Sequence, residues 1–406
     1  MRILFLTQWF QPEPFFKGLP FVKALQARGH QVEVLTGFPN YPGGKIYSGY
    51  NIRPWKFELM DDVPVHRLAL FPSHDASGVK RILNYLSFGL TAAAFGPFLI
   101  KKPDVIYAYN LVTLGLASSI LRTLYRCPVV YDIQDLWPDS VMHSEMMKQS
   151  ILQSILNTWC RFVYRKASHL TTLSPGFKAE LTERGVPEEN VSVVYNWCDE
   201  KHLSMADKDD AIISEIRGKE SFVVLFAGTM GIMQGLDTVL DSAHMLMKIE
   251  PKVKFVFVGG GIEQKRLEQS VVQRNLTNIT FIERQPPEKM NTILKAADVL
   301  LVHLKDTVLF RITIPSKIQA YLFSGKPILM GVQGDSADII RDSGAGKVVK
   351  PENPESITMG ILELFRMSEA ERSVMGKNGR KYYDKKLSMQ AGVSCFENIF
   401  YRLLEK

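Results

Sequence analysis

Cysteine is scarce in this chain, with four among 406 residues. Cys127, Cys160, Cys198 and Cys395 are far apart and none has the spacing of metal ligands, which argues against a disulfide framework and a zinc site. Free thiols in a reducing compartment are expected. The N-terminal run MRILFLTQWF lacks a small-residue cleavage site, so it predicts a first β-strand and not a signal peptide.

Long runs of positive charge are also missing. The net charge of +7 comes from basic residues spread along the chain, and no helix-turn-helix or RNA-binding signature is present. This pattern favours phosphate-bearing ligands or anionic surfaces in general and speaks against a nucleic-acid partner.

Charge is absent altogether from residues 82–100, ILNYLSFGLTAAAFGPFLI, which lie between Lys80–Arg81 and Lys101–Lys102. The length is close to that of a membrane span. Polar residues, glycines and Pro97 interrupt the segment. Three interpretations stay open: a half-buried helix of a folded domain, a helix lying on a membrane surface, and a true span.

A repeated strand–helix pattern fills the rest of the chain. Strands are predicted at 2–7, 31–36, 63–70, 104–109 and 128–133, and again at 221–228, 254–261, 278–284, 298–304, 327–332 and 346–350. Helical patterns at 19–28, 236–249, 263–273 and 288–297 alternate with them. The pattern predicts an α/β protein with two doubly wound parallel sheets. We place the domains at 1–200 and 201–375, followed by C-terminal helices at 376–406.

Turns that follow strands are where such folds bind ligands. Glycines stand in three of these turns, and lysines begin the helices at Lys17–Gly18 and at Pro315-Ser316-Lys317. Free backbone N–H groups at helix starts favour anions, and proline at the first turn costs no hydrogen bond. No carboxylate lies between Asp306 and Asp335. The turns predict a phosphate-bearing ligand held by Lys317.

Acid–base candidates gather after the strand at 128–133. Asp132, Asp135 and Asp139 surround its end, and Asp135 is expected to face a cleft, with a helix N-cap as the alternative. His74 lies in a polar loop, as a candidate or as a solvated loop residue. No spaced cluster supports a metal site.

The motifs resemble those of retaining GT-B glycosyltransferases. The similarity runs through QPEPFFKG, ARGHQVEVLT, SPGFKAEL, VVYNWCD, FAGTMGIMQGLD, VFVGGG, KAADVLL and IPSKIQAYLFSGKPIL. Within that family, GFPNYPGGKIYSGY and DIQDLWPDS resemble enzymes of O-antigen and capsule synthesis identified as N-acetyl-L-fucosamine transferases. The resemblance implies two Rossmann-like domains facing a central cleft, with the C-terminal helix crossing back to the N-terminal domain.

The resemblance also implies partners. The C-terminal domain would hold a nucleotide-sugar donor, with uracil suiting the base site, and the N-terminal domain a polyprenyl-diphosphate-linked sugar acceptor. No metal or other cofactor is expected, because protein donors and helix termini stabilise the leaving diphosphate. The location would be cytoplasmic, at the inner face of the cytoplasmic membrane.

The chain departs from the family at several positions. The family's two glutamates fall on Ile312 and Ala320, its basic pair on Thr229 and Gln234, and its histidine before the aspartate on Gln134. Its contacts to the sugar and ribose therefore cannot be carried over at these positions, and the diphosphate charge must be met elsewhere.

The site residues assigned on this basis fall into four groups. Those for catalysis are Asp135 and Lys317. Those for the donor diphosphate are Lys17, Gly18, Gly228, Thr229, Met230, Arg311, Ser316 and Lys317. Those for the nucleoside are Arg284, Gln285, Pro286 and Gln319. Those for the acceptor are Glu13, Phe16 and His74.

The predicted activity is transfer of a sugar, such as an N-acetylated deoxyhexosamine, from a UDP-sugar to the lipid-linked acceptor. Alternatives are a nucleotide-sugar epimerase of the same fold and a non-catalytic partner in a polysaccharide assembly. A dinucleotide oxidoreductase is disfavoured, because Gly259–Gly261 does not complete the glycine fingerprint.

Overall fold

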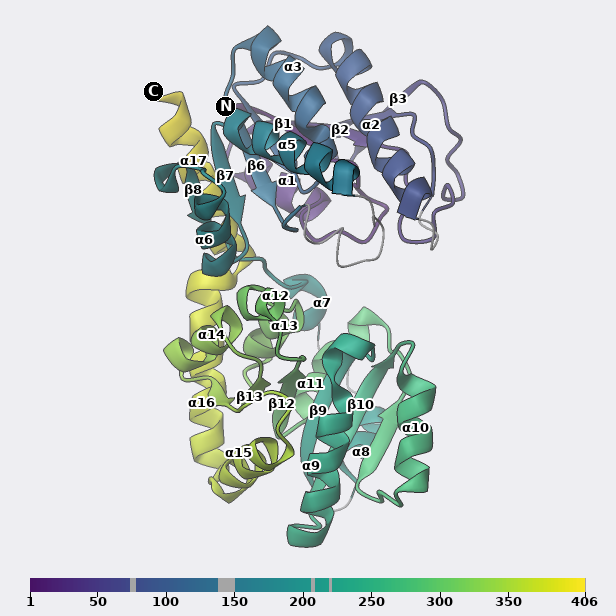
Figure 1. The fold of residues 1–406 in the computed structure, drawn as a ribbon, viewed down its shortest axis with the longest axis vertical. Coiled ribbons are helices and arrows are strands. Elements are labelled where there is room, and N and C mark those ends of the chain that lie inside the picture. The colour runs from purple at the N-terminus through teal and green to yellow at the C-terminus, as the bar shows by residue number, and fades with distance from the viewer. Residues whose placement is uncertain (74–77, 138–149, 206–208, 219–220, 406) are drawn as a thin grey trace. The chain divides into compact units, whose positions relative to one another are not determined.

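The chain forms two compact units, each built around one sheet (Figure 1). The computed structural model describes residues 1–73, 78–137, 150–205, 209–218 and 221–405. The first unit is Met1–Val194 with Val393–Lys406, and the second is Tyr195–Gly392. The predicted fold class, two Rossmann-like α/β domains with parallel sheets, is confirmed.

The sheet of the first unit has the order β3-β4-β2-β1-β5-β6-β7-β8. Its strands are β1 (Arg2–Leu6), β2 (Gln31–Gly37), β3 (Trp55–Met60), β4 (Val63–Leu68), β5 (Val105–Tyr109), β6 (Val129–Ile133), β7 (His169–Thr172) and β8 (Val191–Val193). All neighbours are parallel except β3 and β4, which form a hairpin turning at Asp61 and Asp62 with φ of 47° and 65°. The strand order reverses between β1 and β5, which is where ligands bind in such sheets.

Helices cover this sheet on both faces. They are α1 (Leu19–Ala27), α2 (Gly78–Leu99), α3 (Gly115–Tyr125), α5 (Ser150–Lys166) and α6 (Pro175–Glu183), with short turns η1 (Val112–Leu114) and η2 (Glu188–Asn190). Figure 1 shows α2, α3 and α5 over one face of the sheet. The last helix, α17 (Met389–Leu404), begins in the second unit and ends in the first. There Phe396 packs 5.5 Å from Phe21 and 5.1 Å from Tyr107, measured between ring centroids.

Helix α2 contains the uncharged segment and is half-buried. Asn84, Phe88 and Ala92 are buried against the unit, whereas Leu90 and Phe98 are 58% and 85% exposed. By length and composition the stretch Val79–Leu99 is also long and apolar enough to cross a membrane. In this fold it serves as one of the helices that cover the sheet.

The sheet of the second unit is entirely parallel, with the order β11-β10-β9-β12-β13-β14. The strands are β9 (Phe222–Thr229), β10 (Val253–Gly260), β11 (Ile279–Ile282), β12 (Val299–His303), β13 (Ile328–Gly331) and β14 (Gly346–Val348). Numbered within the unit this is 3-2-1-4-5-6, the Rossmann order, with the reversal between β9 and β12.

The helices of the second unit connect these strands and complete its core. They are α7 (Glu200–Ser204), α8 (Asp210–Arg217), α9 (Leu236–Ile249), α10 (Gln264–Gln273), α11 (Met290–Ala296), α12 (Val308–Ile312), α13 (Lys317–Ser324), α14 (Asp335–Ser343), α15 (Pro354–Arg366) and α16 (Glu369–Tyr382). Two short 3₁₀ turns, η3 (Ile232–Gln234) and η4 (Pro287–Lys289), and one π-helical segment, η5 (Tyr383–Leu387), lie between them. Phe226, Leu240 and Phe257 lie in the buried core between sheet and helices.

Strands β9 and β12 diverge at the reversal point. They pair only at Val299–Val224 and Leu300–Leu225, so the carboxyl end of β9 has no strand partner on that side. The Tyr321 hydroxyl of α13 takes the partner's place, accepting from the Ala227 N–H at 2.8 Å and donating to its carbonyl at 3.3 Å. Helix α13 is thereby fixed to the end of β9.

Candidate functional site

The most unusual side chain at the carboxyl edge of the second sheet is Lys317. It lies one helical turn before Tyr321, so both side chains point to the end of β9. The Lys317 ammonium lies 3.6 Å from the centroid of the Phe226 ring. A Cβ placed on Gly228 would come within 3.2 Å of that ammonium, and Gly228 has a φ of +141°. The lysine head is therefore held directly beside the backbone at Gly228.

Lys317 carries a buried charge without a counter-ion. Among the described residues no acceptor lies within hydrogen-bonding distance of its Nζ atom, although the atom is shielded from solvent. Burial lowers the pKa of Lys317 to about 7. A buried cation of this kind is costly to maintain, and an anion at the end of β9 would remove the cost.

The loop before α13 is held by its own side chains. The Gln319 amide, oriented so that its nitrogen faces the backbone, donates to the Ser316 carbonyl at 2.7 Å and the Pro315 carbonyl at 3.2 Å. Gln319 is 3% exposed. It therefore positions the start of α13, whereas the sequence assigned it to the nucleoside. The Ser316 side chain is exposed at the helix start.

His303, which was not among the predicted site residues, joins the turn after β9 to the loop after β14. It is fully buried at the end of β12, and its Nε2 accepts from the Glu352 N–H at 3.1 Å. Its Nδ1 therefore carries the proton and donates to the Gln234 carbonyl at 2.7 Å. Burial lowers the pKa of His303, which keeps the ring neutral. The sequence does carry one signal for this residue: His303 is a single histidine at the end of an otherwise apolar strand.

Glycines allow the strand ends beside Lys317 to approach closely. A Cβ on Gly259 would lie 2.1 Å from the Gly228 carbonyl oxygen. The Met230 N–H donates to the Gly260 carbonyl at 2.9 Å, and its side chain is fully buried. Gly228 and Thr229 are exposed beside the lysine, whereas Met230 shapes the turn from within.

Other residues assigned to the donor lie near the surface. Arg311 of α12 pairs with Asp306, which precedes that helix, through two hydrogen bonds of 2.8 and 2.9 Å. Arg284, Gln285 and Pro286 follow β11 at the same carboxyl edge, and Gln285 donates to the Glu283 carbonyl at 3.2 Å. Their role toward a nucleoside stays a prediction.

Lys17 has a different surrounding from the one predicted. Its side chain is fully buried, and its Nζ lies 2.7 Å from Asp132 Oδ2. Asp132 also accepts from Tyr107, Thr171 and Gln134 at 2.6, 2.9 and 2.9 Å. Because this cation already has a counter-ion within the protein, we do not retain Lys17 as a diphosphate ligand. Gly18, the N-cap of α1, is buried too.

Glu13, assigned to the acceptor, holds two loops together. It is 1% exposed and accepts backbone hydrogen bonds from Phe10, Asn40 and Tyr41 at 3.1, 2.8 and 2.8 Å. Burial raises its pKa to about 7, against the lowering effect of these N–H groups. The carboxylate shapes the carboxyl edge of the first sheet from within.

The remaining first-unit candidates differ in position. Phe16 is half-buried, and its ring lies 6.0 Å from the Lys17 ammonium. Asp135 lies just beyond β6, where part of the residue reaches solvent but the carboxylate is desolvated; this desolvation raises its pKa, and a hydrogen bond from Asn110 opposes the shift. His74 and Asp139 lie outside the described residues.

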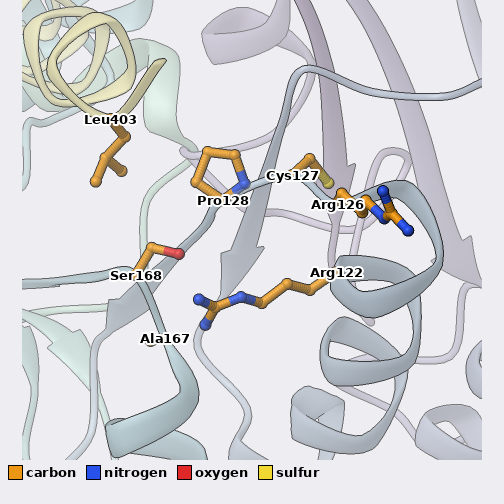
Figure 2. Close-up of a pocket in the computed structure, with 7 residues that line it drawn as sticks. All are labelled: Arg122, Arg126, Cys127, Pro128, Ala167, Ser168 and Leu403. Carbon is orange, nitrogen blue, oxygen red and sulfur yellow. The ribbon is translucent and has the colours of Figure 1, made fainter. Parts of the chain in front are cut away.

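A basic hollow of about 560 Å³ lies at the opposite, amino edge of the first sheet (Figure 2). It is lined by Arg122, Arg126, Cys127, Pro128, Ala167, Ser168 and Leu403. Burial raises the pKa of the Cys127 thiol to about 11, so the thiol stays protonated. Since ligands of doubly wound sheets bind at the carboxyl edge, this hollow is separate from the site around Lys317.

Each half of the chain matches a known protein family. Residues 19–197 match the family described as Glycosyl transferase 4-like domain, and residues 207–382 match the one described as Glycosyl transferases group 1. Together the two matches cover most of the chain. The chain is a glycosyltransferase.

Two relatives are similar to this glycosyltransferase over most of their length. One is the colanic acid biosynthesis glycosyl transferase WcaI of Escherichia coli strain K12, 28% identical over 364 residues, which are 85% of this chain and 86% of the relative. The other is the glycosyltransferase WbjE of Pseudomonas aeruginosa, 26% identical over 307 residues, which are 73% and 74% of the two chains.

Solved structures confirm the GT-B fold of this glycosyltransferase. The Anabaena protein HepE, in complex with UDP, superposes with a TM-score of 0.69 at 16% identity, covering 99% of this chain and 100% of HepE. The residues around Lys317 belong to the unit that matches the group 1 family.

Proposed function

We propose that this glycosyltransferase transfers a sugar from a UDP-sugar to a polyprenyl-diphosphate-linked saccharide during synthesis of a surface polysaccharide. The observation that carries the proposal is the unpaired, buried ammonium of Lys317 beside Gly228. A nucleoside diphosphate supplies the anion that this cation lacks, and Gly228 and Thr229 leave the strand end open to it.

The comparisons support the class of product and the donor separately. WcaI is named for colanic acid biosynthesis, which supports a polysaccharide product. HepE was solved with UDP, which supports a uridine donor. We propose N-acetyl-L-fucosamine or a similar N-acetylated deoxyhexosamine as the transferred sugar, from the resemblance of GFPNYPGGKIYSGY and DIQDLWPDS to such transferases.

We also propose that transfer retains the anomeric configuration and needs no metal. Lys317 and the backbone of the Gly228 turn would stabilise the charge that develops on the leaving diphosphate. Asp135 stays our candidate acid–base residue in the first unit, because it follows directly on β6 at the carboxyl edge of the sheet and its carboxylate is desolvated. A raised pKa makes it a better base than an ordinary carboxylate.

The proposed location is the inner face of the cytoplasmic membrane. Helices α2, α3 and α5 contain no acidic residue. Their basic residues are Lys80, Arg81, Arg122, Arg161, Arg165 and Lys166. Each lysine or arginine near an anionic membrane surface contributes about 1 kcal/mol of binding free energy.

A donor panel tests the proposal. The purified protein is incubated with UDP-sugars, including UDP-N-acetyl-L-fucosamine, and a short polyprenyl-diphosphate saccharide, with and without EDTA. A disaccharide product formed equally well in EDTA is expected. Stable UDP binding without product from any donor would point to the non-catalytic alternative.

A further inference from the structure

An apolar groove lies on the helical layer formed by α2, α3 and α5. Its volume is about 340 Å³. Its main walls are Ile82, Leu86 and Leu90 of α2 and Ile155, Leu156 and Trp159 of α5. The indole N–H of Trp159 already donates to the Val112 carbonyl at 3.0 Å. The volume lies in the range of about 300–1,000 Å³ in which proteins bind small molecules.

Solvent reaches the apolar walls of this groove. Leu86, Leu90 and Ile155 are 46%, 58% and 61% exposed. Adjacent exposed apolar side chains of this kind mark binding surfaces in soluble proteins. The occupant must therefore bring an apolar surface of its own.

The charges of the surrounding helices restrict the occupant further. Since α2, α3 and α5 carry six basic residues and no acidic one, they favour an occupant with negative charge. Arg81 precedes the groove on α2, and its charge acts on the phenol of Tyr85, which lines the groove. The buried Nε of Arg81 has no hydrogen-bond partner among the described residues. The residue directly before the groove on α2 is thus a cation with an unused hydrogen-bond donor.

That end of the groove leads to the carboxyl edge of the sheet. Tyr85 lies 6.2 Å from Trp137, which follows β6, and 5.8 Å from Trp9, which follows β1, between ring centroids. Trp9 stacks on Phe15 at 5.1 Å. Aromatic side chains therefore connect the apolar groove to the loops at the ligand-binding edge.

We propose that this groove binds the isoprenoid chain of the lipid-linked acceptor. The diphosphate then lies at Arg81, and the saccharide extends past Tyr85 toward the carboxyl edge. A neutral hydrocarbon chain without an anionic head would leave the Arg81 donor unused. The inference rests on the proposed function for the identity of the acceptor, and it names where on the first unit the lipid part is held.

Calorimetric binding of two prenyl diphosphates tests the groove without any turnover. Isopentenyl diphosphate has five carbons and farnesyl diphosphate fifteen, with the same anionic head. We expect the wild-type protein to bind the farnesyl compound at least tenfold more tightly, in detergent-free buffer. Leu86→Asp and Leu90→Asp should each abolish that preference, and Arg81→Met should weaken both compounds by the same factor.

Phe98→Asp is the matched control, because Phe98 is 85% exposed on the same helix and does not line the groove. It should keep the tenfold preference. Far-UV circular dichroism and the melting temperature verify that each variant is folded, and exposure of Leu86 and Leu90 makes an added carboxylate tolerable. Equal affinity for the two prenyl compounds, or an unchanged preference in both groove variants, overturns the proposal.

A competitor distinguishes the isoprenoid chain from a phospholipid acyl chain. Dihexanoyl phosphatidylglycerol below its micellar concentration should displace farnesyl diphosphate at least tenfold less effectively than geranylgeranyl diphosphate does. Equal displacement would mean that the groove takes membrane phospholipid, which contradicts the inference. A protein occupant would show as no chain-length preference at all.

The inference and the proposed function can fail separately. If no UDP-sugar yields product, yet farnesyl diphosphate binding depends on Leu86 and Leu90, the groove is a prenyl-binding site and the proposed transfer reaction is wrong. If product forms and the groove variants keep the wild-type Michaelis constant for a long-chain acceptor, the transfer reaction is confirmed and the assignment of the groove is wrong.

Discussion

The ammonium of Lys317 lies 3.6 Å above the ring centroid of Phe226, at the point where β9 loses its neighbour β12. The ring attracts the cation, yet burial dominates and lowers the lysine pKa to about 7. A buried lysine whose charged form is disfavoured by desolvation, at the ligand-binding edge of a sheet, is the pattern of a functional site.

Replacing Lys317 by methionine should separate binding from stability. The affinity for UDP should fall at least tenfold, about 1.4 kcal/mol. The free energy of unfolding at pH 7 should rise, by roughly 1–4 kcal/mol, because a buried cation without a partner is replaced by an apolar side chain. Calorimetry with UDP and urea unfolding measure the two effects. Lys248→Met, on the exposed last turn of α9, is the control. An unchanged UDP affinity would remove Lys317 from the donor site.

UDP binding should be coupled to proton uptake at Lys317. With a pKa of about 7 in the free protein, most of the lysine is neutral at pH 8. A bound diphosphate favours the charged form and raises the pKa, so binding at pH 8 should take up close to one proton. Calorimetry in HEPES and in Tris, which differ in ionisation enthalpy, gives that number. The Lys317→Met variant should show no such uptake; an equal uptake in both proteins would assign the proton to another group.

Glu13 should make the stability of the first unit depend on pH in the acidic range. Burial raises its folded pKa from the ordinary 4.5 to about 7. The folded state therefore binds more protons between these values, so this contribution is fully present below about pH 4.5 and is lost as pH rises through about 7. Glu13→Gln should flatten that slope in urea unfolding from pH 4.5 to 8. The exposed Glu183→Gln is the control, and identical slopes for Glu13→Gln and wild type would contradict the prediction.

The elements that the sequence predicted well are those with a strong apolar period. The strands at 2–7, 31–36 and 298–304 and the helix at 236–249 agree with β1, β2, β12 and α9 within two residues. Strands β3, β7 and β8 were not predicted, because WKFELM exposes its apolar side chains on an edge strand, HLTT is short and polar, and VSV has only three residues. All three depend on neighbouring strands for pairing, which a single sequence does not display.

The site was partly predictable for a related reason. The position of Lys317 at a helix start follows from local signals, so its place at the carboxyl edge could be predicted. The ion pair of Lys17 with Asp132 joins residues far apart in the chain, and no local signal distinguishes such a buried lysine from one that faces a ligand. The bonds of Gln319 to the Pro315 and Ser316 carbonyls are local, but the sequence does not show whether a glutamine in the first turn of a helix turns back to the backbone or faces a ligand.

Membrane binding should depend on the basic hollow at the amino edge of the first sheet. Arg122 and Arg126 line it, and neither lies in the apolar groove. If that edge faces the membrane, the double substitution to glutamine should weaken binding to phosphatidylglycerol vesicles by about 2 kcal/mol at low salt, near thirtyfold. Vesicle sedimentation measures the change, with Lys248→Gln and Lys265→Gln in the second unit as the control. If both double variants lost the same binding free energy, the loss would come from the lower net charge and not from the hollow, which contradicts the prediction.

Breaking the buried ion pair of the first unit should be costly. Asp132→Asn leaves Lys17 as a buried cation without a counter-ion and sets an amide N–H₂ against hydroxyl and amide donors. We expect a loss of about 3–5 kcal/mol in the free energy of unfolding. Asp338→Asn, in an exposed pair with Arg341, should cost no more than about 1 kcal/mol. Adding Lys17→Met to Asp132→Asn should recover part of the loss, because the unpaired charge is then gone. If Asp132→Asn cost no more than the surface control, the buried pair would contribute little to the stability of the first unit, which contradicts the prediction.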